Sequence, residues 1–166
     1  FVAIDRATRW VYLRIYSDQS EVSSTDFLRR LQRTAPMKIV KLLTDHGSQF
    51  TDRFTRKNKT PSGHHAFDRE CALLGIEHRL TPPRHPQTHG RVERFNGRIS
   101  EVLNTTRCNR AELLSTTLAR YAVLYHQQFP QKALDHRASI EAMKEWQRTH
   151  PELFVKRIRK LAGPDT

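Results

Sequence analysis

The sequence predicts a mixed α/β fold followed by a helical C-terminal part. Three observations support this prediction: alternating apolar residues near the N-terminus, an apolar run at residues 38–44, and helical apolar spacing between and after these segments. Strands and helices that alternate along a chain are typical of α/β domains. The 166 residues have room for one core of ordinary size. We therefore expect one domain over residues 1–150 and a basic extension over residues 151–166.

The first two elements are predicted to be strands joined by a short turn. FVAID precedes the polar turn RATR, and WVYLRIY alternates Val11, Leu13 and Ile15 with other side chains. A period of two places one set of side chains on the core face. An antiparallel hairpin follows, and we expect Asp5 to start its turn.

A helix and a strand are predicted next. From residue 21 to about residue 34, Phe27, Leu28 and Leu31 share one helical face, and residues 23–26 offer capping side chains. The run KIVKLLT then predicts a strand buried on both faces. That strand ends at Asp45, and TDHGSQF forms the loop that leaves it.

The middle of the chain is predicted to continue the alternation. Residues 55–65, TRKNKTPSGHH, contain no large apolar residue and indicate an exposed loop. Phe67, Cys71 and Leu74 fit one helical face that Gly75 ends, and IEHRLT reads as a short strand.

The last third is predicted to be mostly helical. A helix starts near Thr88, and a second one ends at Pro130. The apolar stripe of the second helix consists of Leu114, Leu118, Tyr121 and Tyr125. The basic stretch FVKRIRKL predicts an amphipathic helix with Phe154, Ile158 and Leu161 on one face.

Composition restricts the class of protein. Lysines and arginines number 29 against 17 acidic residues, a net charge of +12, which favours a nucleic acid as partner. No apolar run could span a membrane and no signal peptide is evident, so we expect an intracellular protein. Cys71 and Cys108 are isolated and predicted to be reduced thiols, and the scattered histidines do not indicate a zinc site.

Glu93 is the first candidate functional residue. On its predicted helix Glu93 shares a polar face with Asn96, beside an apolar stripe, while cations lie on a third face. These cations are Arg91, Arg94 and Arg98. The apolar stripe consists of Val92, Phe95, Ile99 and Val102. Either Glu93 is a surface acid paired with arginine, or it binds a ligand beside phosphate-binding cations.

Asp45 is the second candidate. It follows a predicted strand at the sheet edge where α/β proteins usually bind ligands, although an aspartate before glycine also commonly caps a turn. Together with Glu93 it could form a carboxylate pair for Mg²⁺, which would serve phosphodiester chemistry.

Two blocks of sequence carry a family resemblance. LLTDHGSQF and RHPQTHGRVERFNGRISEVL resemble signature blocks of the integrase-core, or DDE, transposases and retroviral integrases, whose pattern runs TD-N-G-S-x-F and then P-x-x-x-G-x-x-E-x-x-N. FVAIDRATRWVY is similar to the strand-turn-strand after the first block, and LYHQQFPQKALDHRASIEAM resembles the tail of bacterial insertion-sequence members.

The resemblance implies an RNase H-like mixed sheet flanked by helices and a DNA strand-transfer activity with Mg²⁺ or Mn²⁺. On this interpretation Asp45 and Glu93 are catalytic metal ligands. Basic side chains and the amide of Asn96, close to these two acids, bind the DNA. The implied partners are the DNA ends of a mobile element, target DNA and further copies of the chain, in the bacterial nucleoid of the cytoplasm. The implied DNA-binding residues are Arg91, Arg94, Arg98, Asn96, Arg56, Lys57 and Lys59.

The chain also departs from the family pattern. Asp45 and Glu93 stand 93 − 45 = 48 positions apart, more than in compact members, and the loop at residues 55–65 explains the excess. His46 and His89 replace residues that are usually amides or small. The family's first catalytic aspartate lies on a strand expected upstream of Phe1.

Three functions remain open from the sequence. The chain is either a catalytic core, which we expect to be inactive without the strand upstream of Phe1, or a DNA-binding remnant that lacks one of three acids. A third possibility is an unrelated nucleic-acid-binding domain, in which Trp10, Tyr12 and Tyr16 would form a stacking surface.

Overall fold

The computed structural model describes residues 1–53, 60–82, 86–105 and 111–159; for residues 86–91, 102–105 and 111–112 it describes the backbone alone. The chain divides into two compact units. The first unit contains Phe1, Arg14–Ala35 and Ile39–Arg98, and the second contains Val2–Leu13, Pro36–Lys38 and Ile99–Thr166.

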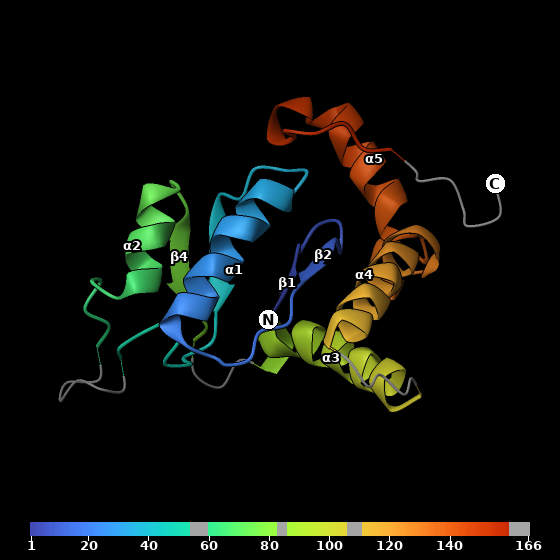
Figure 1. The fold of residues 1–166 in the computed structure, drawn as a ribbon. Helices are drawn as coiled ribbons and strands as arrows, with labels where there is room; N and C mark the ends of the chain where they lie inside the picture. The colour runs from blue at the N-terminus through green and yellow to red at the C-terminus, as the bar shows by residue number, and fades with distance from the viewer. Residues whose placement is uncertain (54–59, 83–85, 106–110, 160–166) are drawn as a thin grey trace. The chain divides into compact units, whose positions relative to one another are not determined.

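In the first unit, helix α1 (Glu21–Thr34) has the predicted bounds (Figure 1). Its N-cap is Ser20, whose hydroxyl accepts the N–H of Ser23 at 3.2 Å. The capping residues predicted at 23–26 are wrong, because the chain already enters the helix at Glu21. The helix buries the predicted apolar residues Phe27, Leu28 and Leu31.

Strands β3 (Lys41–Thr44) and β4 (Glu77–Leu80) form a parallel pair. Both strands alternate exposed and half-buried residues, so the prediction of a strand buried on both faces is wrong. One face carries the charges of Lys41 and Glu77, which form an ion pair at 3.2 Å. Charged side chains keep this face in water, because burying them is costly.

Helix α2 (Ala66–Leu73) packs against the other face of the pair. The ring of Phe67 meets the ring of His78 edge to face at 5.0 Å, and Cys71 is a buried free thiol. Gly75 ends the helix with φ +67°, a conformation that glycine adopts easily. The predicted helix and its stop are thus confirmed.

The N-cap of α2 is His65, whose ring accepts the N–H of Phe67 at 3.2 Å. Its side chain is buried, which corrects the prediction of an exposed loop for this end of residues 55–65. Residues 55–59 of that loop lie outside the described residues.

In the second unit, β1 (Val2–Ile4) and β2 (Val11–Leu13) form the predicted antiparallel hairpin. Asp5 holds the turn, because its carboxylate accepts both the N–H and the hydroxyl of Thr8 at 2.7 Å. This confirms the predicted turn role of Asp5.

Helices dominate the remainder, as predicted. Helix α3 (Pro86–Thr105) spans the boundary between the units, and α4 (Ala111–Gln128) and α5 (Ser139–Thr149) belong to the second unit. Leu118 and Tyr125 of α4 are buried, in agreement with the predicted stripe. Short 3₁₀ helices follow α4 at Lys132–Leu134 and α5 at Pro151–Leu153.

The predicted helix in FVKRIRKL does not form over the described residues 154–159. Phe154 instead forms an antiparallel bridge with Met37, and the N–H of Val155 donates to the carbonyl of Pro36 at 2.9 Å. Phe154 and Ile158 still pack against the buried cluster of α5. Backbone pairing with a distant segment therefore replaces the local helical bonds, while the apolar contacts remain.

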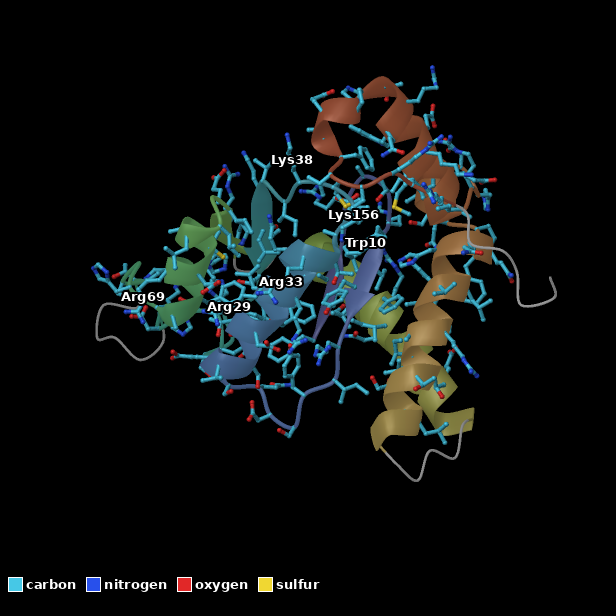
Figure 2. The ribbon with its side chains drawn as sticks, turned by 45° about the horizontal axis from the view of Figure 1, so that its top comes forward. Trp10, Arg29, Arg33, Lys38, Arg69 and Lys156 are labelled. Atoms are coloured by element: carbon cyan, nitrogen blue, oxygen red, sulfur yellow. The ribbon has the colours of Figure 1, made fainter. Side chains whose placement is uncertain are left out.

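Exposed cations are frequent on the helices of the first unit. Arg33 stands on α1 and Arg69 on α2 (Figure 2), both exposed. Within the described parts of the chain, every helix is too short or too polar to cross a membrane.

Candidate functional site

Asp45 lies directly after the C-terminal end of β3, as predicted, and is exposed. Its carboxylate oxygen Oδ1 accepts the backbone N–H of Gly47 at 2.9 Å. The N–H groups of Phe50 and Thr51 both donate to the carbonyl of Gly47, so the chain forms a compact turn after Asp45. The carboxylate therefore has a defined direction on a short, ordered loop.

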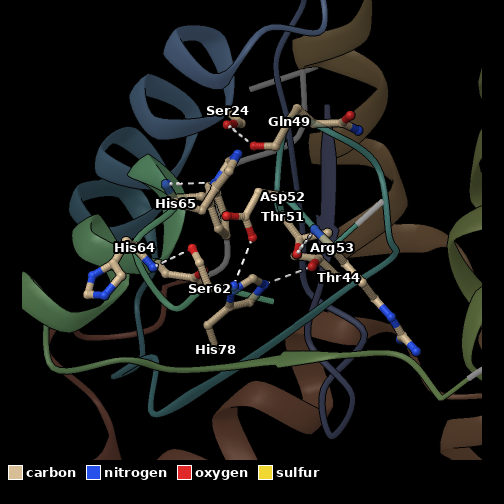
Figure 3. A network of polar contacts seen from close by, with 12 residues as sticks. Ser24, Thr44, Gln49, Thr51, Asp52, Arg53, Ser62, His64, His65 and His78 are labelled. Carbon is tan, nitrogen blue, oxygen red and sulfur yellow. Dashed lines mark hydrogen bonds and ion pairs between the residues drawn. The ribbon is translucent and has the colours of Figure 1, made fainter. Parts of the chain in front are cut away.

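The residue before Asp45 is held by side chains from other elements (Figure 3). The Thr44 hydroxyl contacts Nε2 of His78 at 2.8 Å, and the other ring nitrogen of His78 contacts the carboxylate of Asp68. The carbonyl of Thr44 accepts both the N–H and the hydroxyl of Thr81, at 2.8 and 2.7 Å. Thr44 is thus fixed by β4 and α2.

The loop after Asp45 is fixed as well. Nε2 of His46 contacts the carbonyl of Thr81 at 2.7 Å. The hydroxyl of Ser24 donates to the carbonyl of Gln49 at 2.7 Å, and Nε2 of His65 contacts the carbonyl of Ser48 at 3.0 Å (Figure 3). Helix α1 and the N-terminus of α2 therefore brace the loop that carries Asp45.

Glu93 stands on α3 with its side chain exposed. Phe95 is buried, which supports the predicted apolar stripe of this helix. Arg94, Asn96 and Arg98 are exposed on the same helix. Glu93 thus points away from the apolar stripe.

Several predicted DNA-binding residues cannot be described. The side chain of Arg91 is outside the described side chains, and Arg56, Lys57 and Lys59 lie outside the described residues. They remain predictions from the sequence.

Asp45 and Glu93 belong to the same compact unit, which includes Ile39–Arg98. Across the described residues, no group of three or more His, Cys, Asp or Glu side chains is arranged to hold a metal ion. Mg²⁺ usually keeps several waters and takes only one or two carboxylates from a protein. The carboxylates of Asp45 and Glu93 are of this ligand type.

Other acids near the two strands have structural partners. Glu77 contacts Lys41 and Arg79, and these contacts lower the pKa of its carboxyl, Arg79 most strongly. Glu70 of α2 is bound by the guanidinium of Arg29 at 2.6 and 2.8 Å, which also lowers the pKa of that carboxyl. These acids are therefore bound to neighbouring cations of the fold.

The aromatic residues considered as a stacking surface have contacts inside the protein. Trp10 stacks on His126 and on Tyr12, with ring centroids 6.1 and 6.3 Å apart, and packs against the buried cluster of α5. The hydroxyl of Tyr16 donates to Asp26. These contacts do not favour the interpretation as an unrelated nucleic-acid-binding domain with these rings as its stacking surface.

The sequence analysis missed the residues that hold Thr44. His78 and Leu80 are the half-buried positions of β4, and this period of two was the available signal for an inward-facing His78. Nothing in the sequence pattern indicated that Asp68 would meet it.

Comparison with known proteins adds three likenesses. The sequence model described as Integrase core domain matches residues 1–86. The retrovirus-related Pol polyprotein from transposon TNT 1-94 of Nicotiana tabacum is 32% identical over 104 residues, which cover 61% of this chain and 7% of that protein. The ORF3 protein of Spiroplasma virus SpV1-C74, which is named as an integrase, is 25% identical over 103 residues. These residues cover 60% of this chain and 28% of that protein.

A solved structure is similar over nearly the whole chain. The crystal structure of the catalytic core domain of BIV integrase has a TM-score of 0.66 and 19% identity, and the likeness covers 89% of this chain and 86% of that one. At this identity the likeness concerns the fold, and it confirms the predicted RNase H-like α/β class. The chain spans less than a third of the length of each of the two sequence relatives, so the activity of the whole relative is not transferred with the likeness.

Proposed function

This chain belongs to the Integrase core domain family, and we propose that it is the catalytic core of a DNA transposase or integrase. The proposed reaction is metal-dependent phosphodiester cleavage and strand transfer during transposition. Family membership supports a function of the transposase or integrase type. The observation that carries the finer proposal is the exposed carboxylate of Asp45 at the end of β3, on a braced loop in the same unit as Glu93.

We propose that Asp45 and Glu93 hold Mg²⁺ or Mn²⁺. Their carboxylates offer the hard oxygen donors that these ions prefer, and both side chains are exposed, so water and phosphate oxygens can complete the ligand set. When bound, such an ion supplies Lewis-acid polarisation of the phosphodiester group. The contribution of the chain is to fix the direction of Asp45 through the Gly47 N–H.

Exposed cations on α3 are the proposed DNA contacts. Arg94 and Arg98 are exposed on the helix that carries Glu93, and Asn96 offers an amide for hydrogen bonds with DNA. Arginine side chains neutralise phosphates and position the duplex without reading its sequence. Further copies of the chain are the proposed protein partners.

A second function is a DNA-binding domain without chemistry. It is favoured by the finding that the described part of the chain contains no group of three metal-ligand side chains. The family resemblance implies a third carboxylate beyond Asp45 and Glu93, so the two functions differ in whether metal-dependent cleavage occurs.

The first experiment measures cleavage. Two proteins are compared: the chain as given, and a version extended to include the strand expected upstream of Phe1. Each is incubated with Mn²⁺ or Mg²⁺ and a labelled duplex that carries the end sequence of the mobile element. We expect the extended version to cleave the duplex when the metal is present and the chain as given to bind the duplex without cleaving it. In the extended version cleavage should be lost in Asp45→Asn and Glu93→Gln and retained in Glu77→Gln. DNA binding by both versions without cleavage by either would support the second function instead.

The second experiment measures DNA affinity against salt concentration. The double variant Arg94→Ala and Arg98→Ala should flatten the slope of log affinity against log salt by about two units, with little change in sequence preference. Arg30→Ala is the matched control, because Arg30 pairs with Asp26 on α1. An unchanged slope in the double variant would show that this face of α3 does not bind DNA.

A further inference from the structure

We propose that His78 is a positioning residue for Asp45. It holds Thr44, which directly precedes Asp45, and it is itself held by Asp68. The functional meaning of this arrangement rests on the proposed role of Asp45 as a metal ligand. The positioning of the Asp45 carboxylate can be tested without that role.

The contacts form a continuous line from α2 through β4 to β3, and Figure 3 shows its link between His78 and Thr44. The side chain of His78 is only 6% exposed, and its Nδ1 meets the Oδ1 atom of Asp68. Its Nε2 lies 2.8 Å from the hydroxyl of Thr44, and that hydroxyl lies 3.1 Å from the carbonyl oxygen of Asp45. An ionised carboxylate only accepts hydrogen bonds, so Nδ1 of His78 must carry a proton.

The hydrogen bonds between Asp68, His78, Thr44 and the Asp45 carbonyl can all form at the same time. When both ring nitrogens of His78 donate, the Thr44 hydroxyl accepts from Nε2 and its single proton is free to donate to the Asp45 carbonyl. The half-buried carboxylate of Asp68 would then act on the backbone of Asp45 through two intermediate groups, the His78 ring and the Thr44 hydroxyl. Such chains of bonds strengthen one another in a protein interior.

A second set of hydrogen bonds fixes the peptide group between Thr44 and Asp45. The Thr44 carbonyl belongs to the peptide group that joins Thr44 to Asp45, and it accepts two bonds from Thr81. The hydroxyl and the carbonyl of Thr44 are therefore both fixed. Because the orientation of this peptide group sets where the Asp45 side chain begins, it determines whether the carboxylate reaches the Gly47 N–H at 2.9 Å.

A purely structural role for His78 is the competing explanation. A buried histidine with two polar partners stabilises any fold, and its removal would then lower stability without a specific effect on Asp45. Glu70 provides the matched control, because it lies two positions from Asp68 on α2 and is bonded to Arg29 rather than to Thr44. Glu70→Gln should weaken the same helix and leave Asp45 in place.

The test uses variants of Thr44 in the full chain and needs no metal for its first measurement. The amide proton resonance of Gly47 reports its bond to the Asp45 carboxylate. Thr44→Val keeps the shape but lacks the hydroxyl, and we expect it to move this resonance upfield. Thr44→Ser restores the hydroxyl and should restore the resonance. Asp68→Asn should resemble Thr44→Val, and Glu70→Gln should resemble the unchanged chain.

The second measurement adds Mn²⁺ alone and follows free Mn²⁺ by electron paramagnetic resonance. Orienting partners of metal ligands typically affect affinity by 10–100-fold, so we expect about tenfold weaker Mn²⁺ binding in Thr44→Val and recovery in Thr44→Ser. Asp45→Asn defines complete loss of the site.

The outcomes separate the two proposals. If the Gly47 resonance moves as expected but Mn²⁺ binding does not depend on Asp45, the positioning role stands and the proposed metal site fails. A folded Thr44→Val variant and a folded Asp68→Asn variant that both leave the Gly47 resonance and Mn²⁺ affinity unchanged would overturn the positioning role. If a His78→Gln variant does not fold, the Thr44→Val and Asp68→Asn variants still test the positioning role.

Discussion

Protonation of His126 should destabilise the second unit at mildly acidic pH. The ring of His126 on α4 is mostly buried, stacks on Trp10 and accepts the backbone N–H of Val11 at Nε2, at 2.8 Å. Burial lowers the pKa of this histidine to about 4, because the charged ring loses its hydration. A protonated Nε2 also cannot accept the Val11 N–H. The native state therefore requires a neutral ring.

The size of the effect follows from the two pKa values. An unfolded histidine has a pKa near 6.5, so between pH 6.5 and about 4 the unfolded chain binds the proton more readily than the folded chain. Stability must therefore fall as the pH falls through this window. The linkage relation gives a loss of roughly 2 kcal/mol at pH 5 and about 3 kcal/mol at pH 4, relative to neutral pH. Most mesophilic domains have only about 5–15 kcal/mol in total.

Urea unfolding between pH 4 and pH 7 provides the assay. The variant His126→Gln keeps an acceptor for the Val11 N–H but does not titrate, so the difference between its curve and the original isolates the histidine. Other acids with lowered pKa values, among them Glu145 beside Arg137, contribute to both curves equally. His136→Asn is the control, since His136 is exposed and its φ of +61° suits asparagine. Equal pH dependence in His126→Gln and the original chain would refute the reasoning.

Three further predictions concern the first unit. Leu28→Ala should lower the free energy of unfolding by roughly 2–5 kcal/mol, because Leu28 is 0% exposed, whereas Val22→Ala at a position 77% exposed should have little effect; equal effects in urea unfolding would contradict the described core. Ser20→Ala should cost about 1 kcal/mol by removing the N-cap of α1, measured by thermal unfolding, and a loss no larger than that of an exposed-site alanine would argue against this cap. Cys71 should resist iodoacetamide at pH 8, because burial raises the pKa of its thiol to about 12; peptide mapping of the native chain checks this, and rapid labelling there would contradict the burial.

Local patterns were sufficient where the interactions are local. The bounds of α1 follow from its apolar spacing, and the stop of α2 follows from the positive φ available to Gly75. The polar segment after KIVKLLT placed Asp45 at a strand end, because a strand that leaves the sheet must turn into a polar loop. The family resemblance in the same segments agrees with the matched family over residues 1–86.

Distant pairing decided the features that the patterns predicted wrongly. Phe154 and Ile158 have helical spacing, yet the backbone there pairs with Pro36 and Met37 and stays non-helical. Apolar periodicity specifies which side chains seek the core, but it does not specify which backbone partner is available. β3 was also predicted to be buried on both faces, since its apolar run could not reveal that Lys41 would meet Glu77 on an exposed face.

The sequence by itself determined the fold class, the family and the positions of Asp45 and Glu93 on their elements, because these depend on composition, periodicity and motif spacing. Only the tertiary structure decided what surrounds Asp45. Thr44, Asp68 and His78 are separated along the chain, and the parallel pairing of β3 with β4 and the packing of α2 bring them together. Such a contact depends on the register of two strands and on the placement of a helix, which no local pattern encodes.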